Sequence, residues 1–395
     1  MKITMMSRWN IPCGVSLHAE LIGRAWVEMG HDLTVLAPVE WEGYRSSPDE
    51  PYVRRCYRLP EPRRKEGFFF DPKPFLHGDP DIFVVENLEI LPMEDLLRIY
   101  PHIRKRAKTV LVVHEGRPPA DQTFYRFDWD GVVCFDRRYK RFLKEIYPEE
   151  RIHIIPYPCH PVRHGDKSEA RQKLGLPQDK RIIFNYGIGV YRHLHLLPSI
   201  KRVNHDHPLM LLTMTHIQDW YELFDAVRWA YPFIELRKGE IPTDELYTYL
   251  HASDVLLIHK DSAEAVVVPS TACLCLGAGR PILAYDTNFF ETFDGEVIKY
   301  RELEVTLREL FQDKYDIEST LESAERFVKR NSSEVVAETF LRLFESLLSR
   351  YPFSRALPFR REAPRGSPFL PKETGYGGGD PFLRSGGGIA GRKAG

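Results

Sequence analysis

The chain has 395 residues, of which 43% are hydrophobic and 28% charged, and its formal net charge is −1. This balance excludes a disordered or fibrous protein, and the length suffices for two domains with separate cores. Because there is no overall positive charge to attract nucleic acid, we expect no nucleic-acid partner and a local site for any anion.

The cysteines and the N-terminal residues indicate the cellular compartment in which we expect the protein. The six cysteines form no CxxC pair, which favours a reduced cytoplasmic protein without a metal site. The opening MKITMM lacks the pattern of a signal peptide, and no segment reaches the roughly 20 apolar residues that cross a bilayer. We expect a soluble cytoplasmic protein, or at most one peripheral to the inner face of a membrane.

The first forty residues alternate between strand and helix. Residues 2–6 and 33–37 are short apolar runs, and residues 16–29 carry apolar side chains at helical spacing, with Gly30 placed as a C-cap. A strand, a helix and a strand in so few residues predict a parallel unit. Further strands are predicted at 81–86, 109–114, 131–135 and 151–156.

A proline-rich stretch, 156–161, is the best domain boundary, because a second strand–helix alternation begins after it. The pattern predicts an α/β fold with two doubly wound, Rossmann-like domains facing a cleft. Their predicted ranges are 1–157 on the acceptor side and 158–350 on the donor side. Residues 351–395 are rich in Gly, Pro and Arg, and we expect a disordered tail.

Several familiar motifs are absent. The chain has no GxxxxGK[ST], GxGxxG, HExxH or GxSxG pattern, which disfavours P-loop, dinucleotide, zinc-protease and serine-hydrolase chemistry. The acidic pair Asp128 and Asp130 resembles a metal–diphosphate motif, but it leads into a predicted strand. A structural role is therefore favoured for this pair.

Six segments, in order, resemble the family 4-like, B-type (GT-B) glycosyltransferases over roughly residues 1–345. They are 13–38, 109–115, 131–135 followed by 154–158, 187–192, 252–258 and 268–284. The resemblance implies a transferase that moves a sugar from a nucleotide-sugar donor to a small or lipid-linked acceptor. It implies retention of configuration, and no metal or cofactor beyond the nucleotide-sugar co-substrate.

The resemblance implies a donor site around a glycine loop and a helix start. The donor-binding residues would be Gly187, Gly189, Arg192, Val268, Ser270 and Thr271. A helix N-terminus suits phosphate groups, and arginine is a good phosphate partner. The alternatives are an ordinary helix cap at Ser270 and a surface arginine at 192.

Glu264 would be the acidic residue beside the donor sugar, although a solvated loop carboxylate is at least as good an interpretation. The family's second glutamate, on the ribose, should fall within 272–274, where this chain has Ala, Cys and Leu. None of these can replace a carboxylate. The departure puts the donor's identity and the activity in question.

On the acceptor side, the candidates are Gly14, His18 and Glu86, with Glu115 ranked beside them. His114 ends a predicted strand and is, with Glu264, the catalytic candidate, since α/β sites form at strand ends. The alternative for His114 is a structural histidine.

The basic segment 137–144, RRYKRFLK, could contact anionic lipid or a lipid-linked acceptor, or could simply be a solvated helix face. Two rival functions stay open. One is a degenerate, non-catalytic GT-B protein that binds a sugar nucleotide or a partner protein. The other is a different enzyme of this fold, such as an epimerase or a phosphorylase.

Overall fold

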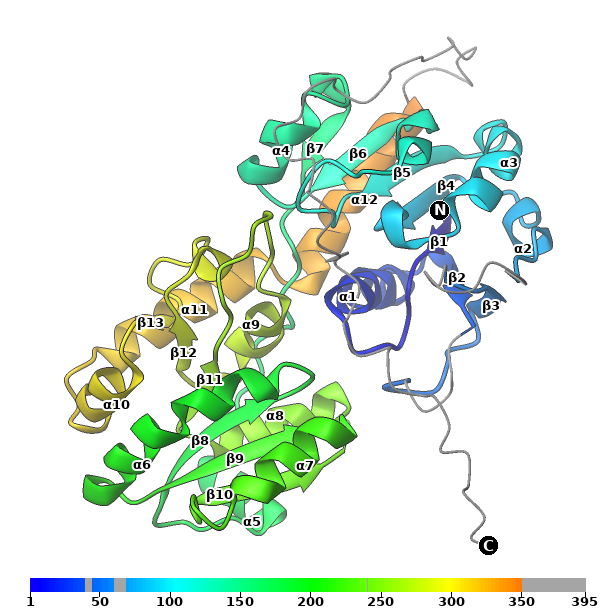
Figure 1. The fold of residues 1–395 in the computed structure, drawn as a ribbon. Helices are drawn as coiled ribbons and strands as arrows, with labels where there is room; N and C mark the ends of the chain where they lie inside the picture. The colour runs from blue at the N-terminus through cyan, green and yellow to red at the C-terminus, as the bar shows by residue number, and fades with distance from the viewer. Residues whose placement is uncertain (40–44, 60–68, 240, 350–395) are drawn as a thin grey trace, which may run out of the picture.

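The computed structural model describes residues 1–39, 45–59, 69–239 and 241–349, which form two domains, each built on a parallel β-sheet (Figure 1). The prediction of two doubly wound domains is confirmed. The predicted tail, 351–395, lies outside the described residues. Within them, no helix is both long enough and apolar enough to cross a membrane.

The sheet of the first domain has seven strands in the order β3-β2-β1-β4-β5-β6-β7. Met5 on β1 lies opposite Val35 on β2 and Val84 on β4, so β1 is an interior strand, next to the central strand β4. Most of these side chains are buried on both faces, as expected of a parallel sheet between helices. The strands are β1 (Lys2–Met6), β2 (Asp32–Pro38), β3 (Val53–Tyr57), β4 (Ile82–Glu86), β5 (Lys108–Val112), β6 (Gly131–Cys134) and β7 (Ile152–Ile154).

Helices alternate with these strands along the chain. The longest, α1, follows β1 directly, and the Cys13 sulfur accepts a hydrogen bond from Ser16 N–H at its start. The helices are α1 (Gly14–Glu28), α2 (Lys73–Leu76), α3 (Met93–Arg104) and α4 (Arg137–Leu143), with short 3₁₀ helices η2 (Leu88–Ile90), η3 (Gln122–Arg126) and η4 (Glu149–Arg151).

The sheet of the second domain has six strands in the order β10-β9-β8-β11-β12-β13, all parallel. The strands are β8 (Arg181–Tyr186), β9 (Leu209–Thr215), β10 (Ile234–Lys238), β11 (Val255–Ile258), β12 (Ile282–Tyr285) and β13 (Ile298–Tyr300). The helices are α5 (Lys167–Leu174), η5 (Val190–Leu196), α6 (Leu197–Asp206), α7 (Gln218–Val227), α8 (Thr243–Ala252), α9 (Ser270–Cys275), η6 (Leu276–Ala278), η7 (Asn288–Phe290), α10 (Leu303–Phe311), α11 (Ile317–Arg330) and α12 (Ser333–Ser349).

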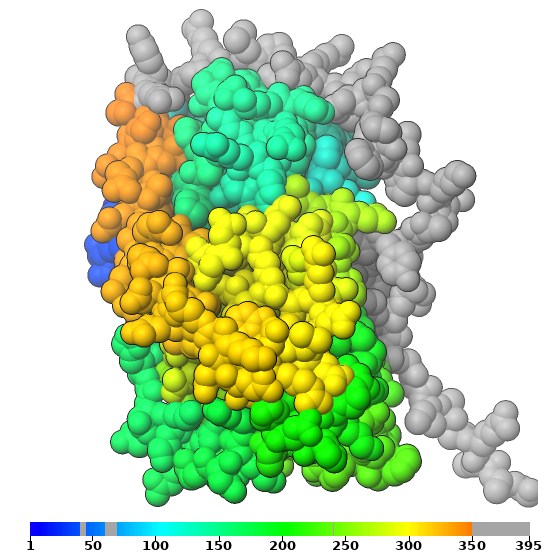
Figure 2. Space-filling view, turned by 90° about the vertical axis from the view of Figure 1, so that its left-hand side faces the viewer, coloured from blue at the N-terminus to red at the C-terminus, as the bar shows by residue number. Residues whose placement is uncertain are grey.

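The chain crosses between the domains twice, at adjacent places. Cys159 N–H, on the outgoing segment, donates to Asn331 O (2.6 Å), just before α12. Helix α12 then packs on the first domain, where Phe340 lies 5.8 Å from Trp26 of α1, between ring centroids. Figure 2 shows α12 in orange beside the teal residues of the first domain. The sequence analysis included residues 333–349 in the second domain, predicted as 158–350. In the structure, helix α12 packs on the first domain instead.

The buried apolar side chains form two clusters. The larger runs from both faces of the first sheet through the contact between the domains to one face of the second sheet. The smaller fills the other face of the second sheet, beneath α6, α7 and α10. Because apolar packing continues across the domain contact, the loops of the two domains are held close together.

Candidate functional site

A cavity of about 280 Å³ lies between the two domains, next to the loops that follow β1, β8, β9, β10 and β11. In doubly wound folds, ligands bind at the carboxyl ends of the strands, where the strand order reverses. In the second sheet this reversal lies between β8 and β11. The first domain lines the cavity with Ile11, Pro12, Cys13, Gly14, Leu17, Glu20 and Ser46.

One wall of the cavity is the contact between the start of α1 and the start of α9. A Cβ atom on Gly14 would lie 3.0 Å from Ser270 Oγ, so the two helix starts touch. The Tyr157 hydroxyl donates to Gly14 O (2.6 Å) and fixes this loop. Thr271 also lines the cavity. The fold therefore brings three predicted site residues, Gly14, Ser270 and Thr271, to one wall.

The loop after β8 forms another part of the wall and contains both predicted glycines. Gly187 has φ of +95°, a backbone region that favours glycine, and its N–H donates to Met214 O (3.0 Å). Gly189 lies against Lys260, because a Cβ atom at 189 would be 3.1 Å from Lys260 Nζ. Both glycines line the cavity.

The other three predicted donor-side residues do not line the cavity. Arg192 forms an ion pair with Asp261, and its guanidinium lies over the Tyr191 ring, 5.1 Å from the centroid. Glu264 is exposed. Val268 is half-buried beside α9, and its carbonyl accepts a hydrogen bond from Ser270 N–H (2.9 Å).

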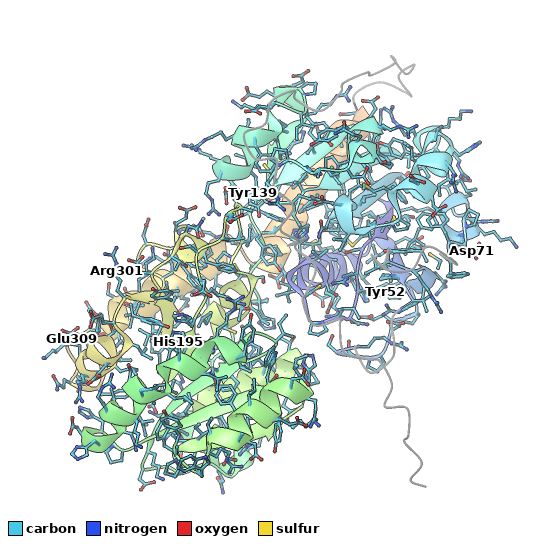
Figure 3. All side chains as sticks on the ribbon, in the orientation of Figure 1. Tyr52, Asp71, Tyr139, His195, Arg301 and Glu309 are labelled. Atoms are coloured by element: carbon cyan, nitrogen blue, oxygen red, sulfur yellow. The ribbon has the colours of Figure 1, made fainter. Side chains whose placement is uncertain are left out.

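Between the predicted catalytic residues His114 and Glu264, the two domains touch. Val266 N–H donates to Gly116 O (2.9 Å), and a Cβ atom on Gly116 would lie only 1.9 Å from Val266 O. Tyr139, on α4, donates to Val266 O (3.4 Å) from the first domain, and Figure 3 shows it at the junction of the two domains. The loops that carry the two catalytic candidates are therefore neighbours.

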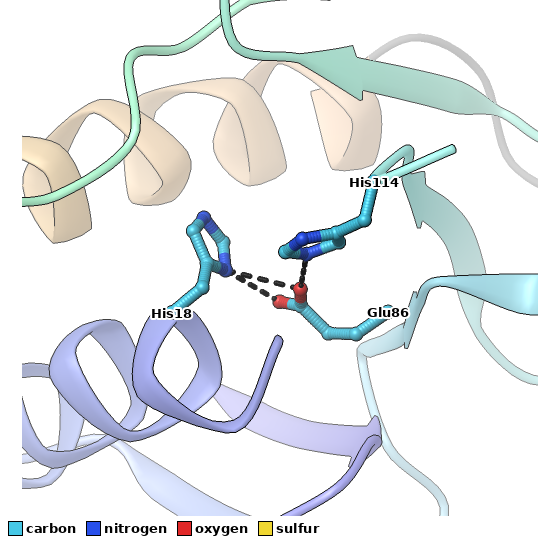
Figure 4. A group of neighbouring side chains, drawn as sticks. All are labelled: His18, Glu86 and His114. Atoms are coloured by element: carbon cyan, nitrogen blue, oxygen red, sulfur yellow. Dashed lines mark hydrogen bonds and ion pairs between the residues drawn. The ribbon is translucent and has the colours of Figure 1, made fainter. Parts of the chain in front are cut away.

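His114 belongs to a buried cluster with two acceptor-side candidates (Figure 4). His114 Nε2 lies 2.7 Å from a Glu86 carboxylate oxygen, and His18 Nδ1 lies 3.0 Å from the same carboxylate. The side chains of His18 and Glu86 are fully buried, and that of His114 is 9% exposed. Phe135 packs against both histidine rings. Three residues far apart in the sequence thus form one unit, beside the described lining of the cavity rather than in it.

Burial and the two histidines act oppositely on Glu86. Burial favours the neutral acid, but His18 and His114 favour the carboxylate and together lower the pKa of Glu86 to about 2. Burial lowers the pKa of His114. The Glu86 carboxylate is therefore ionised at neutral pH, with His114 favoured as the neutral ring.

The same cluster has the donor types of a transition-metal site. One ligand atom from each of His18, Glu86 and His114 lies within 4.8 Å of the others. The carboxylate already accepts hydrogen bonds from both rings, however, so a metal would have to displace two charge-assisted bonds. We therefore interpret the cluster as a hydrogen-bonded network.

Glu115, next to His114, is also buried. Its Oε1 accepts Glu89 N–H (2.9 Å), while its Oε2 has no partner, and burial raises the pKa of Glu115 to about 6. Asp128 and Asp130 have the structural role that the sequence favoured: Asp128 binds Arg104 (2.6 Å), and Asp130 accepts Thr109 N–H (2.9 Å).

The basic helix α4 turns Tyr139 and Leu143 into the core and leaves Phe142 half-buried. Its lysines pair with an acidic neighbour, since Lys140 and Lys144 lie 3.1 Å and 2.9 Å from Glu149. These contacts fit the solvated-face interpretation, and contact with lipid stays a prediction.

Sequence reasoning missed several residues that line the cavity, above all Lys260, with His193, His216 and His259. Lys260 lies two residues after Ile258, the last residue of β11, and the carboxyl ends of central strands are where α/β sites form. The position of Lys260 was therefore the signal that could have identified it. Burial lowers the pKa of His193 to about 3 and that of His259 to about 4.

No protein-family model matches the chain. Among solved structures, a glycosyltransferase from Rickettsia africae ESF-5 superimposes with a TM-score of 0.63 at 14% identity, covering 89% of this chain and 99% of that one. The two-domain arrangement is thus shared over nearly the whole of both chains. The fold is the GT-B glycosyltransferase fold.

Two further solved structures with the GT-B fold also superimpose on nearly the whole chain. Sucrose-phosphate synthase from Thermosynechococcus elongatus has a TM-score of 0.62 at 12% identity, covering 89% of this chain and 100% of that one. Anabaena HepE in complex with UDP-glucose has a TM-score of 0.62 at 12% identity, covering 88% and 100%. At such low identity the GT-B likeness establishes the fold, and the chemistry has to be argued from the site.

Proposed function

We propose that this protein is a glycosyltransferase that moves a sugar from a nucleotide-sugar donor to a hydroxyl acceptor. The observation that carries the proposal is the cavity between the two domains, where Gly14, Gly187, Gly189, Ser270 and Thr271 come together. A GT-B structure with a bound UDP-sugar, that of HepE, supports the choice of donor class.

The diphosphate would lie between Gly14 and the start of α9. A helix start leaves its first N–H groups without carbonyl partners inside the helix, and Ser270 N–H is already used by Val268 O. The N–H groups of Thr271 and Ala272 therefore remain for phosphate oxygens, with the side-chain hydroxyls of Ser270 and Thr271 beside them. Apolar residues of the cavity, Met214, Ile241 and Leu246, suit the flat face of a base.

The transfer breaks the bond between the anomeric carbon and the diphosphate oxygen and forms one to the acceptor oxygen. The leaving phosphate can take the acceptor's proton, so a retaining, metal-independent reaction does not require a protein base. The acceptor, a small sugar or a lipid-linked one, would approach the wall formed by the first domain, near Glu20 and Ser46.

A second candidate is a protein that binds a sugar nucleotide without turning it over. Where the family resemblance expects the ribose carboxylate, this chain has Ala272 and Cys273, both buried, and Leu274, which lines the cavity. An apolar side chain cannot accept the ribose hydroxyl bonds. This departure is the observation that favours binding without transfer.

A screen of nucleotide sugars separates the two candidates. Thermal stabilisation by a donor, followed by release of its nucleotide and labelling of an acceptor, supports the transferase. Stabilisation without release supports the binding protein. The variant Thr271→Val keeps the shape of the side chain and removes its hydroxyl, so it should weaken either response. Thr339→Val, at a half-buried position on α12 that does not line the cavity, is the matched control. If no nucleotide sugar shifts the melting temperature, both candidates are wrong.

A further inference from the structure

The loop that precedes α9, residues 264–268, is held from the first domain. It leads to α9, whose first two residues line the cavity. Gly116 O accepts Val266 N–H, and the Tyr139 hydroxyl donates to Val266 O (Figure 3). A third contact comes from Arg138, the neighbour of Tyr139 on the basic helix α4.

Arg138 bridges the two domains with one guanidinium group. Its Nη2 donates to Val267 O (3.0 Å), and its Nη1 forms an ion pair with Glu291, so both partners belong to the second domain. Within the first domain, Nε and Nη2 donate to the Asp136 carboxylate at 3.1 Å and 2.7 Å. Arginine suits this position, because its planar group offers several donors in fixed directions, which a lysine does not.

The direction of the Arg138 side chain is set by the start of its own helix. Asp136 is the N-cap of α4 and accepts Arg138 N–H (2.7 Å). The same carboxylate binds the guanidinium, and the Arg138 side chain is only 19% exposed. The cap therefore fixes both the first turn of α4 and the side chain that reaches across to the second domain.

Glu291 lies next to a segment that holds the other end of the loop. It directly follows η7, in which Asn288 Oδ1 accepts Ala263 N–H (2.9 Å) and Asn288 Nδ2 donates to Ala263 O (2.7 Å). The loop thus begins at a residue bound to η7, and Arg138 contacts both the end of η7 and the later part of the loop. Arg138 therefore holds these two segments of the second domain in place together.

The neighbouring basic residues of α4 are placed differently. Arg137 is exposed, and Lys140 and Lys144 pair with Glu149 of the first domain. The basic character of the segment therefore does not explain the contact made by Arg138, which depends on its particular position.

We propose that Arg138 is a positioning residue of the donor site. It holds residues 264–268 where α9 begins, so that Ser270 and Thr271 face the cavity, while Arg138 itself lies outside the described lining. The inference rests on the proposed function for its effect on the donor, because it concerns the wall of that same cavity. It implies that the shape of this wall, which belongs to the second domain, depends on contact with the first.

The first test measures amide hydrogen exchange of the full chain without ligand. Arg138→Met removes every donor of the side chain. We expect exchange in residues 264–272 to become roughly tenfold faster or more, as the loss of hydrogen bonds made by a charged group implies, while β8 exchanges as in the wild type. Arg138→Lys keeps the charge without the planar fork and should give an intermediate rate. Arg137→Met, at the adjacent exposed position, is the matched control and should leave the loop unchanged.

The second test measures the affinity of the same variants for UDP and ADP by titration calorimetry. Only molecules with the loop in place present the complete wall, so Arg138→Met should weaken binding of whichever diphosphate the wild type binds by about threefold or more. Arg137→Met should bind as the wild type does, and Arg138→Lys should again lie between.

The outcomes separate this inference from the proposed function. Wild-type exchange of residues 264–272 in Arg138→Met overturns the inference, as does faster exchange through the whole second domain, which would show a general stabilising role. A faster loop with unchanged diphosphate affinity overturns it too. If the wild type binds no nucleotide, the proposed function fails, whereas a faster loop still supports the role of Arg138 in holding it. If Arg138→Met does not fold, Arg138→Lys provides the same comparison.

Discussion

Glu86 and His114 are joined by a hydrogen bond of 2.7 Å at the carboxyl ends of two adjacent central strands, with the carboxylate fully buried. His18 approaches the same carboxylate from α1. One buried negative charge is therefore held by two rings from different elements, which links the first helix of the domain to the middle of its sheet.

Replacing this charge tests how much the cluster stabilises the domain. Glu86→Gln keeps the shape but loses the negative charge that both rings bind, and losing hydrogen bonds to a buried charged group costs about 3 kcal/mol. We expect a loss of that size in the free energy of unfolding in urea. Glu28→Gln, at an exposed position on α1, should change it by less than about 0.5 kcal/mol. A loss below about 1 kcal/mol for Glu86→Gln would mean that packing alone holds the cluster.

Acid should destabilise the protein through its buried histidines. The pKa of His193 is lowered to about 3, whereas an unfolded histidine titrates near 6.5, so the unfolded chain takes up a proton that the folded protein refuses. The stabilisation is complete above pH 6.5 and falls as the pH drops towards 3. This group alone predicts a loss of about 2 kcal/mol between pH 7 and pH 5.

A substitution of His193 tests its share of this pH dependence without the pKa values of the other titratable groups. Nδ1 of His193 lies 3.1 Å from Val190 O, and Nε2 accepts His259 N–H at 3.2 Å. His193→Asn should be less stable at pH 7, because it loses one of these bonds, yet its stability should fall less steeply with acid. Parallel pH profiles for the wild type and the variant would show that His193 does not carry the dependence.

Helix α12 should stabilise the first domain although it follows the second in the sequence. Phe340 is fully buried between Trp26 and His18, so Phe340→Ala should cost about 3–5 kcal/mol and speed amide exchange in α1. Leu348→Ala, at a position that is 40% exposed on the same helix, should cost less than about 1 kcal/mol. Faster exchange confined to the second domain would contradict this packing.

The contact at Gly116 should control how closely the domains approach. A methyl group there would collide with the backbone oxygen of Val266, which cannot rotate away as a side chain can. Gly116→Ala should lower the melting temperature and increase the radius of gyration measured by X-ray scattering. Gly295→Ala, where the nearest atom lies 3.7 Å from the added carbon, is the matched control. An unchanged scattering profile would show that the loop adjusts locally.

Much of the fold could be predicted from local pattern. The apolar runs of β1, β4, β5, β8 and β11 are short and buried, and their alternation with amphipathic helices predicted the two doubly wound sheets. The strand β3 was not predicted, because VRRCY is polar in its middle and lies at an edge of the sheet. That α12 packs on the first domain could not be predicted either, because the sequence of a helix does not determine which domain its apolar face will cover.

The candidate site also has a part that could be predicted from the sequence and a part that could not. Gly14, Gly187, Gly189, Ser270 and Thr271 stand in loops whose position next to strands can be read from the sequence, and they line the cavity. The positions of the charged side chains, by contrast, could not be predicted from the sequence. Lys260 lines the cavity, whereas Arg192, which is paired with Asp261, does not.

The sequence by itself therefore determined the succession of strands and helices, the two sheets and the glycine and serine loops, because hydrophobic spacing and turn chemistry act over a few residues. Only the tertiary structure decided that His18, Glu86 and His114 share one buried charge, that α12 returns to the first domain, and that Lys260 enters the cavity. Those outcomes depend on contacts between residues that are distant in the chain, and on burial, which fixes the charge state of a side chain.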